Sequence, residues 1–153
     1  MSRNSPHFWL ATWFGTGLSP TAPGTVGTLA SLPAHFLLIQ LPWLWHLAAL
    51  LVLIGAGTWS ANKLAHEMKL EDPQIVVIDE TAGVLLALFL AGTTTWLSVV
   101  AAVVLFRLLD ITKPWPISAA EHLKPAGVGI MADDIVAGIG AGLLTVLGLS
   151  LLA

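Results

Sequence analysis

Two adjacent pairs of acidic residues have the type and position to do chemistry. Asp79-Glu80 directly follows the β-branched residues 75–78, and Asp133-Asp134 directly precedes the last apolar segment. A single acid at such a position could cap a helix or interact favourably with the positive end of the helix dipole. Two adjacent acids, repeated at a second boundary, exceed what capping requires. The repetition therefore favours a functional site.

A third charged group lies between the two acidic pairs. Arg107, Asp110 and Lys113 are spaced by three residues, and on a helix Arg107 and Asp110 share a face. A local ion pair at the end of a helix would explain the same spacing. This group therefore gains significance only in combination with the acidic pairs.

Together these groups predict a site for a metal ion and a phosphate. Carboxylates without Cys or His partners favour a hard cation with oxygen ligands, such as magnesium (Mg²⁺). We expect one or two such ions to be held by Asp79, Glu80, Asp110, Asp133 and Asp134. The cations Arg107 and Lys113 among these acids favour binding of a phosphate. This combination is typical of phosphoryl chemistry, in which charge stabilisation and activation of water do most of the work.

Residues 15–28, GTGLSPTAPGTVGT, predict an ordered loop because they are rich in Gly, Pro and Thr. Gly24-Thr25 and Gly27-Thr28 resemble turns whose backbone N–H groups converge on an anion. Gly24 and Thr25 are therefore candidate phosphate-binding residues. The GK[ST] sequence of a P-loop is absent from the sequence. A surface turn that leads into a helix, capped by Thr25 or Thr28, explains these residues equally well.

The chain around these polar groups is unusually apolar. Six basic and nine acidic residues give only 15 charged residues among 153. Hydrophobic residues make up 56% of the chain, and its mean hydropathy is +0.86. A water-soluble fold would need about twice as many charges for its surface. We therefore expect an all-α integral membrane protein, a multi-helix bundle with helical hairpins that forms a single domain over residues 1–153.

The composition also excludes several functional classes. The net charge of −3 argues against a nucleic-acid partner, because no basic patch could neutralise a run of phosphates. The absence of Cys excludes thiolate nucleophiles, disulfides and Cys-ligated metals. The N-terminal segment has one Arg and no clear apolar core before a small-residue cleavage site, so we expect no removed signal peptide.

Fourteen of the charged residues fall in two segments, 63–80 and 107–134, and the apolar segments around them predict helices. We expect a hairpin of two helices, at about 29–40 and 43–69, because Pro42 breaks the apolar run. A last helix is expected at about 134–152, where Gly138 and Gly142 would permit close packing. Residues 127–129, Gly-Val-Gly, are expected to be flexible backbone beside the second acidic pair.

Residues 81–106 allow two topologies. A continuous helix of 26 residues could span a membrane, whereas a break at 91–95 leaves halves of about ten residues that cannot cross a ~30 Å core. A single span would separate the two charged segments, and a hairpin that turns back at Gly92 would bring them to one side. The predicted turns at 41–46 and 91–95 contain no Lys or Arg, so the positive-inside rule favours the hairpin and a cytoplasmic polar site.

At these residues the chain resembles the bacterial phosphatidylglycerophosphatase A family. The matching pieces follow the family order and cover most of the polar part of the chain: GTGLSP (15–20), PGT (23–25), IDE (78–80) with Gly83, FRLLD (106–110), KPWPI (113–117), GVGIM (127–131), DDI (133–135) and AG (137–138). The pieces are specific together, although no single piece is specific alone. Thr81-Ala82 departs from the pattern, where the family has bulkier apolar residues, which concerns packing more than chemistry.

The resemblance implies a Mg²⁺-dependent phosphatase of the bacterial inner (cytoplasmic) membrane. It would hydrolyse the phospholipid phosphatidylglycerophosphate to phosphatidylglycerol and phosphate, with its site facing the cytoplasm. The expected catalytic residues are Asp79, Asp110, Asp134 and Lys113, and a metal-activated water would attack phosphorus. A covalent route through Asp110 is favoured less, because residues 110–112 lack the second Asp of the haloacid-dehalogenase-type nucleophile motif.

A small membrane transporter or channel subunit is the alternative function. Its clustered acids would line an ion path at mid-helix depth, whereas the acids here are expected at helix ends, which favours an enzyme at the membrane surface. A noncatalytic scaffold would give no reason for the cluster. The other charged residues of the two segments are expected to form a solvated rim: Lys63, Glu67, Lys69, Glu71, Asp72, Glu121 and Lys124.

Overall fold

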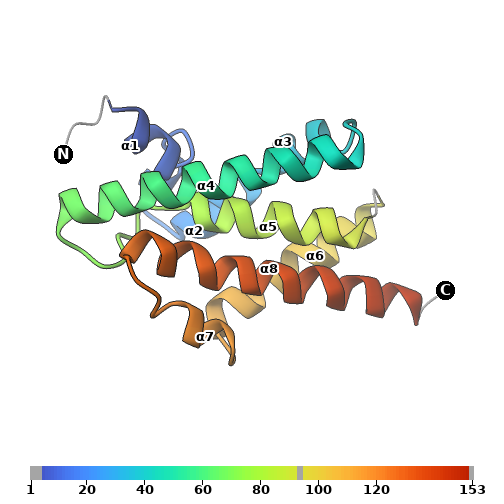
Figure 1. The fold of residues 1–153 in the computed structure, drawn as a ribbon. Helices are drawn as coiled ribbons and strands as arrows, with labels where there is room; N and C mark the ends of the chain where they lie inside the picture. The colour runs from blue at the N-terminus through green and yellow to red at the C-terminus, as the bar shows by residue number, and fades with distance from the viewer. Residues whose placement is uncertain (1–4, 93–94, 152–153) are drawn as a thin grey trace.

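The computed structural model describes residues 5–92 and 95–151, and every regular element in these ranges is helical (Figure 1). This confirms the predicted all-α class. The elements are α1 (Pro6–Ala11), the 3-10 turn η1 (Thr16–Leu18), α2 (Pro23–Ala30), α3 (Leu32–Leu38), α4 (Trp43–Met68), α5 (Ile78–Ala91), α6 (Trp96–Thr112), α7 (Ile117–Ala120) and α8 (Ala126–Ser150).

Helix α5 forms the core of the bundle. Eleven of its residues are buried, and it packs against α4, α6 and α8. Figure 1 shows α4, α5 and α8 running side by side, with α2 and α6 behind them. Burial on nearly all sides explains why α5 has a nearly continuous apolar sequence after its first turn. The two acids of that first turn, Asp79 and Glu80, are therefore held on the most enclosed helix.

Small residues allow α8 to approach α5 closely. A side chain at Gly138 would overlap the backbone of Gly83, and a side chain at Gly142 would overlap Ala87 and Leu90. Gly138 and Gly142 are the pair that the sequence predicts as a packing face, and in the structure this face contacts α5. The close contact fixes the position of α8 relative to the first turn of α5.

Helices α5 and α6 form an antiparallel hairpin. Gly92 ends α5 in the left-handed conformation, with φ of +64°, which favours glycine. The N-terminus of α5 and the C-terminus of α6 consequently lie at the same end of the bundle, and Arg107 Nη1 is 3.9 Å from Glu80 Oε1. The hairpin topology is therefore confirmed, although residues 93–94 of the predicted turn lie outside the described residues.

The predicted boundaries in the N-terminal third are wrong. The expected loop 15–28 contains η1 and most of α2, and the expected helix 29–40 is divided between α2 and α3. Pro23 lies in the first turn of α2, where its missing N–H does not cost a hydrogen bond. Pro33 has the same place in α3, and the chain is interrupted just before it, at Ser31. Two prolines thus begin two short helices.

The predicted start of the last helix is also wrong, because α8 begins at Ala126. Residues 127–129 are helical. Glycine is required at two of these positions, because a side chain at Gly127 would overlap α4 at Asn62, and one at Gly129 would overlap the carbonyl of Glu121. The Gly127 N–H also donates to Asn62 Oδ1 at 3.2 Å. These glycines serve close packing rather than flexibility, and Asp133 and Asp134 consequently lie inside α8.

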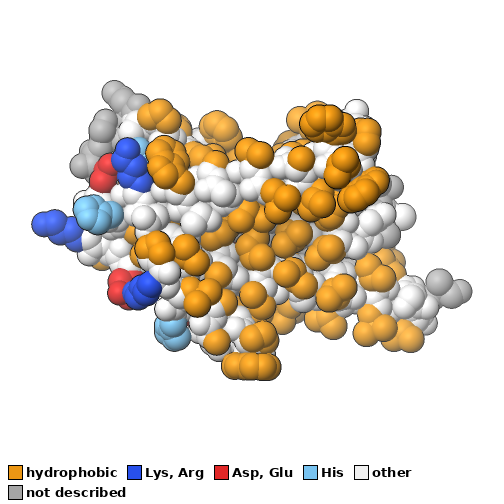
Figure 2. Space-filling model, viewed as in Figure 1, with side chains coloured by type: hydrophobic (Ala, Val, Ile, Leu, Met, Phe, Trp, Pro, Cys, Tyr) orange, Lys and Arg blue, Asp and Glu red, His pale blue; other side chains and the backbone are white. Residues whose placement is uncertain are grey.

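The outer surface is that of a membrane protein. Helices α4 and α8 are long and apolar enough to cross a membrane, judged by length and composition. On the face in Figure 2, hydrophobic side chains cover most of the surface, and charged side chains gather at the left end. Both ends of the bundle carry exposed tryptophans, which are typical of membrane–water interfaces: Trp43, Trp45 and Trp96 at one end, Trp9 and Trp115 at the other.

Candidate active site

A cavity of about 530 Å³ opens at the charged end of the bundle. Its wall is formed by the first turns of α2 and α5, the C-terminal end of α6, the N-terminal part of α8 and the segments before α5 and α8. The charged residues that the sequence singles out all line it: Asp79, Glu80, Arg107, Asp110, Lys113, Asp133 and Asp134. The fold thus brings both acidic pairs and the Arg107 group into one place.

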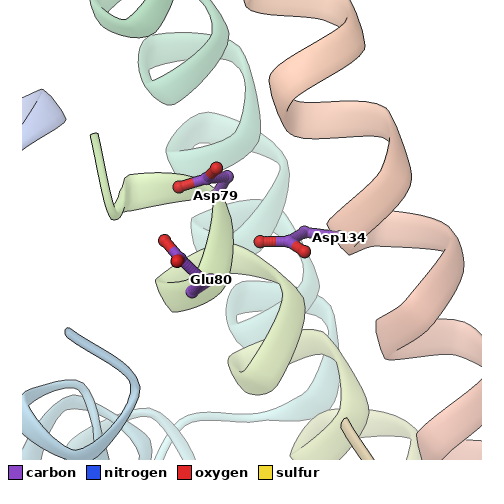
Figure 3. A group of neighbouring side chains, drawn as sticks. All are labelled: Asp79, Glu80 and Asp134. Atoms are coloured by element: carbon purple, nitrogen blue, oxygen red, sulfur yellow. The ribbon is translucent and has the colours of Figure 1, made fainter. Parts of the chain in front are cut away.

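Three carboxylates form the centre of this cavity (Figure 3). Asp79, Glu80 and Asp134 each offer one oxygen, and these oxygens lie within 4.8 Å of one another. Figure 3 shows the side chains projecting from α5 and α8 towards a common space. Asp79 Oδ1, Glu80 Oε2 and Asp134 Oδ2 are buried without a hydrogen-bond partner among the residues described. Buried negative charge without a partner is costly, so the cluster is suited to a cation.

The first turn of α5 is held by the N-terminal segment. The N-cap residue is Val77, whose N–H donates to the carbonyl oxygen of Ala11 at 2.9 Å. The backbone of Ile75 lies so close to Gly17 that a side chain at position 17 would overlap the Ile75 carbonyl. Asp79 is thus a first-turn residue and not the N-cap. Both acids still lie near the positive end of the helix dipole, which offsets part of the cost of burying their charge.

Arg107 connects α6 to the carboxylate cluster. Its guanidinium forms an ion pair with Asp110, as the spacing of three predicts, and approaches Glu80. The Nε–H of Arg107 is buried and has no acceptor among the described residues. Arg107 is therefore oriented by Asp110 and retains a buried donor that no described residue accepts from.

Lys113 is the C-cap residue of α6 and lines the same cavity as Arg107. Its ammonium donates to Asp133 at 2.6 Å and lies 3.2 Å from Glu121 Oε2. Burial alone would lower the pKa of Lys113, but the hydrogen bond to Asp133 and the charge of that carboxylate outweigh burial and raise the pKa. Lys113 is consequently a fixed cation at neutral pH.

Helix α2 contributes backbone rather than side chains. Gly24 lies in its first turn and lines the cavity, against the Glu80 carboxylate and near Arg107 Nη1. The first N–H groups of a helix have no partner within it, so this turn can add donors. Thr25 belongs to the same turn but does not line the cavity. The structure therefore brings Gly24 into the site and leaves Thr25 beside it.

Part of the expected rim also lines the cavity. Glu71, Asp72, Glu121 and Lys124 all contribute to its wall, and Lys124 pairs with Glu71 at 2.7 Å on the exposed side. Sequence reasoning missed the contact between Glu121 and Lys113, since no spacing pattern relates the two residues. Eight acidic residues and three Lys or Arg residues line the cavity, an excess of five negative charges with His neutral. Such a cavity attracts cations and repels free anions.

Comparisons with known proteins agree with these features. Residues 9–149 match the family model described as Phosphatidylglycerophosphatase A. The phosphatidylglycerophosphatase A of Escherichia coli (strain K12) is 41% identical over 151 residues, which cover 97% of this chain and 87% of the relative. That of Haemophilus influenzae is 36% identical over 142 residues, 91% of this chain and 86% of the relative.

A third relative carries a different name. A Bacteroides thetaiotaomicron protein, named "Putative phosphatidylinositol-3-phosphatase", is 44% identical over 137 residues, which cover 85% of each chain. No solved structure matches this chain.

Proposed function

The chain belongs to the phosphatidylglycerophosphatase A family, and from this premise we propose that it hydrolyses phosphatidylglycerophosphate to phosphatidylglycerol and phosphate. It is a phosphatase whose substrate is a phospholipid. The observation that carries the assignment to this site is the group of three largely enclosed carboxylates beside two oriented cations, all in one cavity at the charged end of the bundle.

Mg²⁺ is the cofactor that we propose. Carboxylate oxygens without partners are the ligands that a hard divalent cation prefers, so Asp79, Glu80 and Asp134 fit this ion and would hold it. Asp110 forms an ion pair with Arg107, and Asp133 forms one with Lys113. Each of these acids would therefore be a weaker ligand for the metal than the three central carboxylates. When bound, Mg²⁺ would neutralise charge at the phosphate and lower the pKa of a coordinated water.

Arg107 and Lys113 are the proposed phosphate-binding residues. The planar guanidinium of Arg107 can offer its free Nε–H to a phosphate oxygen, while Asp110 keeps the group in place. Lys113 offers a positive charge held by Asp133 and Glu121. Gly24 leaves room beside Glu80, so backbone N–H groups of α2 could reach the same phosphate.

A carboxylate of the central cluster is the proposed general base. Asp79 and Asp134 each have an oxygen free of hydrogen bonds among the described residues, so either could accept the proton of the attacking water. Asp110 is less suited to act as a nucleophile, because its carboxylate already bonds to Arg107. These roles divide the five acids into two functional groups.

We propose that the lipid stays in the bilayer while its headgroup enters the cavity. The apolar surface supports this arrangement, since acyl chains can remain beside the helices. The predicted turns at 41–46 and 91–95 contain no Lys or Arg, which supports an orientation in the inner membrane with the cavity facing the cytoplasm. In the transporter alternative, acids lie at mid-helix depth. Asp133 and Asp134 do lie within α8, but they face the same cavity at the end of the bundle as Asp79.

Phosphatidylinositol 3-phosphate is a second candidate substrate. The Bacteroides relative is named for that activity, and its identity to this chain is similar to that of the Escherichia coli relative. Both lipids carry a terminal phosphate ester, so the same cations could bind either. The two differ in the size of the headgroup that must enter the cavity.

The test is phosphate release by the purified protein in detergent, with each lipid at equal concentration. We expect faster release from phosphatidylglycerophosphate, loss of activity with EDTA and recovery with excess Mg²⁺. Release that EDTA does not affect would exclude the metal, and faster release from the inositol lipid would reverse the substrate assignment. Ion flux in liposomes without phosphate release would support the transporter alternative.

A further inference from the structure

A second hollow lies next to the acidic cavity, at the same end of the bundle. Its volume is about 950 Å³, and it is formed by the C-terminal part of α4, residues 69–71 and the start of α8. Glu71 and Ala126 line both spaces, so the two are neighbours. The proposed reaction gives no role to any residue of this hollow.

The hollow presents two lysines without acidic partners. Among the residues that the structure describes, neither Lys63 nor Lys69 lies within ion-pair distance of a carboxylate. The two acids of the hollow are engaged elsewhere, Glu67 with His7 and Glu71 with Lys124. The hollow therefore carries two positive charges that are free to bind an anion.

Apolar side chains also line the hollow, and they place it at a membrane interface. Trp59 and Leu70 line it and are about half exposed, and the Lys63 ammonium lies 5.5 Å from the centroid of the Trp59 ring. Trp43, at the other end of α4, is about 24 Å away along the helix axis at 1.5 Å per residue. By the same rise Lys63 is about 30 Å from Trp43, which matches the thickness of a hydrocarbon core, so Lys63 would lie among lipid headgroups.

We propose that this hollow binds the headgroup of an anionic phospholipid. The phosphate lies between Lys63 and Lys69, and the glycerol and first acyl carbons lie against Trp59 and Leu70. Basic pockets at the ends of membrane helices favour such headgroups, because the membrane already places the phosphate at this depth. A zwitterionic lipid binds less well, since its net charge is zero and the two lysines attract it less than a lipid with a net negative charge. The site is distinct from the catalytic cavity, and lipid bound there is not a substrate.

Native mass spectrometry of the purified protein tests this site. The protein in neutral detergent is mixed with equal amounts of phosphatidylserine and phosphatidylcholine, because neither lipid carries a terminal phosphate for the catalytic site. We expect the wild type to retain phosphatidylserine preferentially. Lys63→Gln with Lys69→Gln should lower its affinity for phosphatidylserine by roughly fivefold for each lysine. Lys63→Arg with Lys69→Arg, the matched control, should keep the preference.

Two results would overturn the proposal. One is an unchanged preference in the glutamine variant, and the other is a loss of preference that the arginine variant shares. Phosphate release in neutral detergent should be unchanged in both variants, because neither lysine lines the catalytic cavity. Absence of phosphatase activity in the wild type would instead contradict the proposed function and leave the lipid preference unaffected.

Discussion

The five cavity carboxylates that the sequence predicts as metal ligands differ in what surrounds each of them. Asp110 and Asp133 bond to cations of the same site, whereas Asp79, Glu80 and Asp134 each keep a buried oxygen without a partner. The sequence predicts all five as metal ligands, because each offers a carboxylate. The structure separates three acids suited to a cation from two acids that orient Arg107 and Lys113.

Replacing an acid of the central group should abolish turnover without loss of the protein from the membrane. For Asp79→Asn and Asp134→Asn we expect phosphate release to fall by roughly a hundredfold or more, since each loses a charge needed for the metal and for proton transfer. The control is Glu67→Gln, which changes an acid outside the cavity lining. Near-normal turnover in both Asn variants would refute the site.

Gly24 should be intolerant of even one methyl group. In Gly24→Ala the added carbon would overlap the Glu80 carboxylate, which must then leave its place in the cluster. We expect kcat/KM to fall by about tenfold, as for other changes that misplace a group of a metal site. Gly55→Ala is the matched control, because a methyl group at Gly55 meets nothing within 4 Å. Equal effects of the two substitutions would contradict the proposed role of Gly24.

At the scale of elements, the sequence predicts the α5–α6 hairpin and the small face of α8 but misplaces where helices start. The hairpin follows from local signals, namely Gly92 and the absence of Lys and Arg from the turn. The start of α8 depends on contacts between Gly127 and α4, which no local pattern reveals. Glycine has low helix propensity, so residues 127–129 predict a loop until tertiary packing is known.

The contact between α5 and α8 should be sensitive to added volume. Gly138→Ala places a methyl group against the Gly83 backbone, and separation of the helices would also move Asp134 away from Asp79. We expect a loss of about 1–3 kcal/mol in stability, as for other overpacked sites, together with reduced activity. Thermal unfolding in detergent measures the first effect. Gly148→Ala, where nothing lies within 4 Å, should leave both unchanged.

At the scale of the whole molecule, the charge of the cavity links metal binding to folding. An excess of five negative charges lines one end of the bundle, and their mutual repulsion opposes the folded state. A cation that binds only the folded protein offsets that repulsion. Stability therefore offers a measure of metal binding that does not depend on turnover.

Mg²⁺ should raise the unfolding temperature of the metal-free protein. At a hundredfold excess over the dissociation constant, linkage predicts a gain of about 2.7 kcal/mol. The Asp79→Asn with Asp134→Asn double variant should lose most of this gain. NaCl at matched ionic strength controls for screening. An equal Mg²⁺ effect in the wild type and the double variant would place the metal elsewhere.

The orientation of the bundle can be measured with single cysteines, because the natural chain contains none. Gln40 lies at the turn between α3 and α4, and Glu67 lies at the charged end of α4. In intact spheroplasts, a thiol reagent that cannot cross membranes should label Gln40→Cys. Glu67→Cys should be labelled only after the membrane is opened. The reverse pattern would place the cavity outside the cytoplasm.

The order of the cavity residues along the chain has a consequence for biogenesis. Gly24 leaves the ribosome early, whereas Asp133 and Asp134 arrive with α8, after every other helix of the site has been made. The carboxylate cluster is therefore incomplete until α8 has inserted and docked against α5. A partly synthesised chain in the membrane should consequently have no phosphatase activity, so catalysis begins only with the completed bundle.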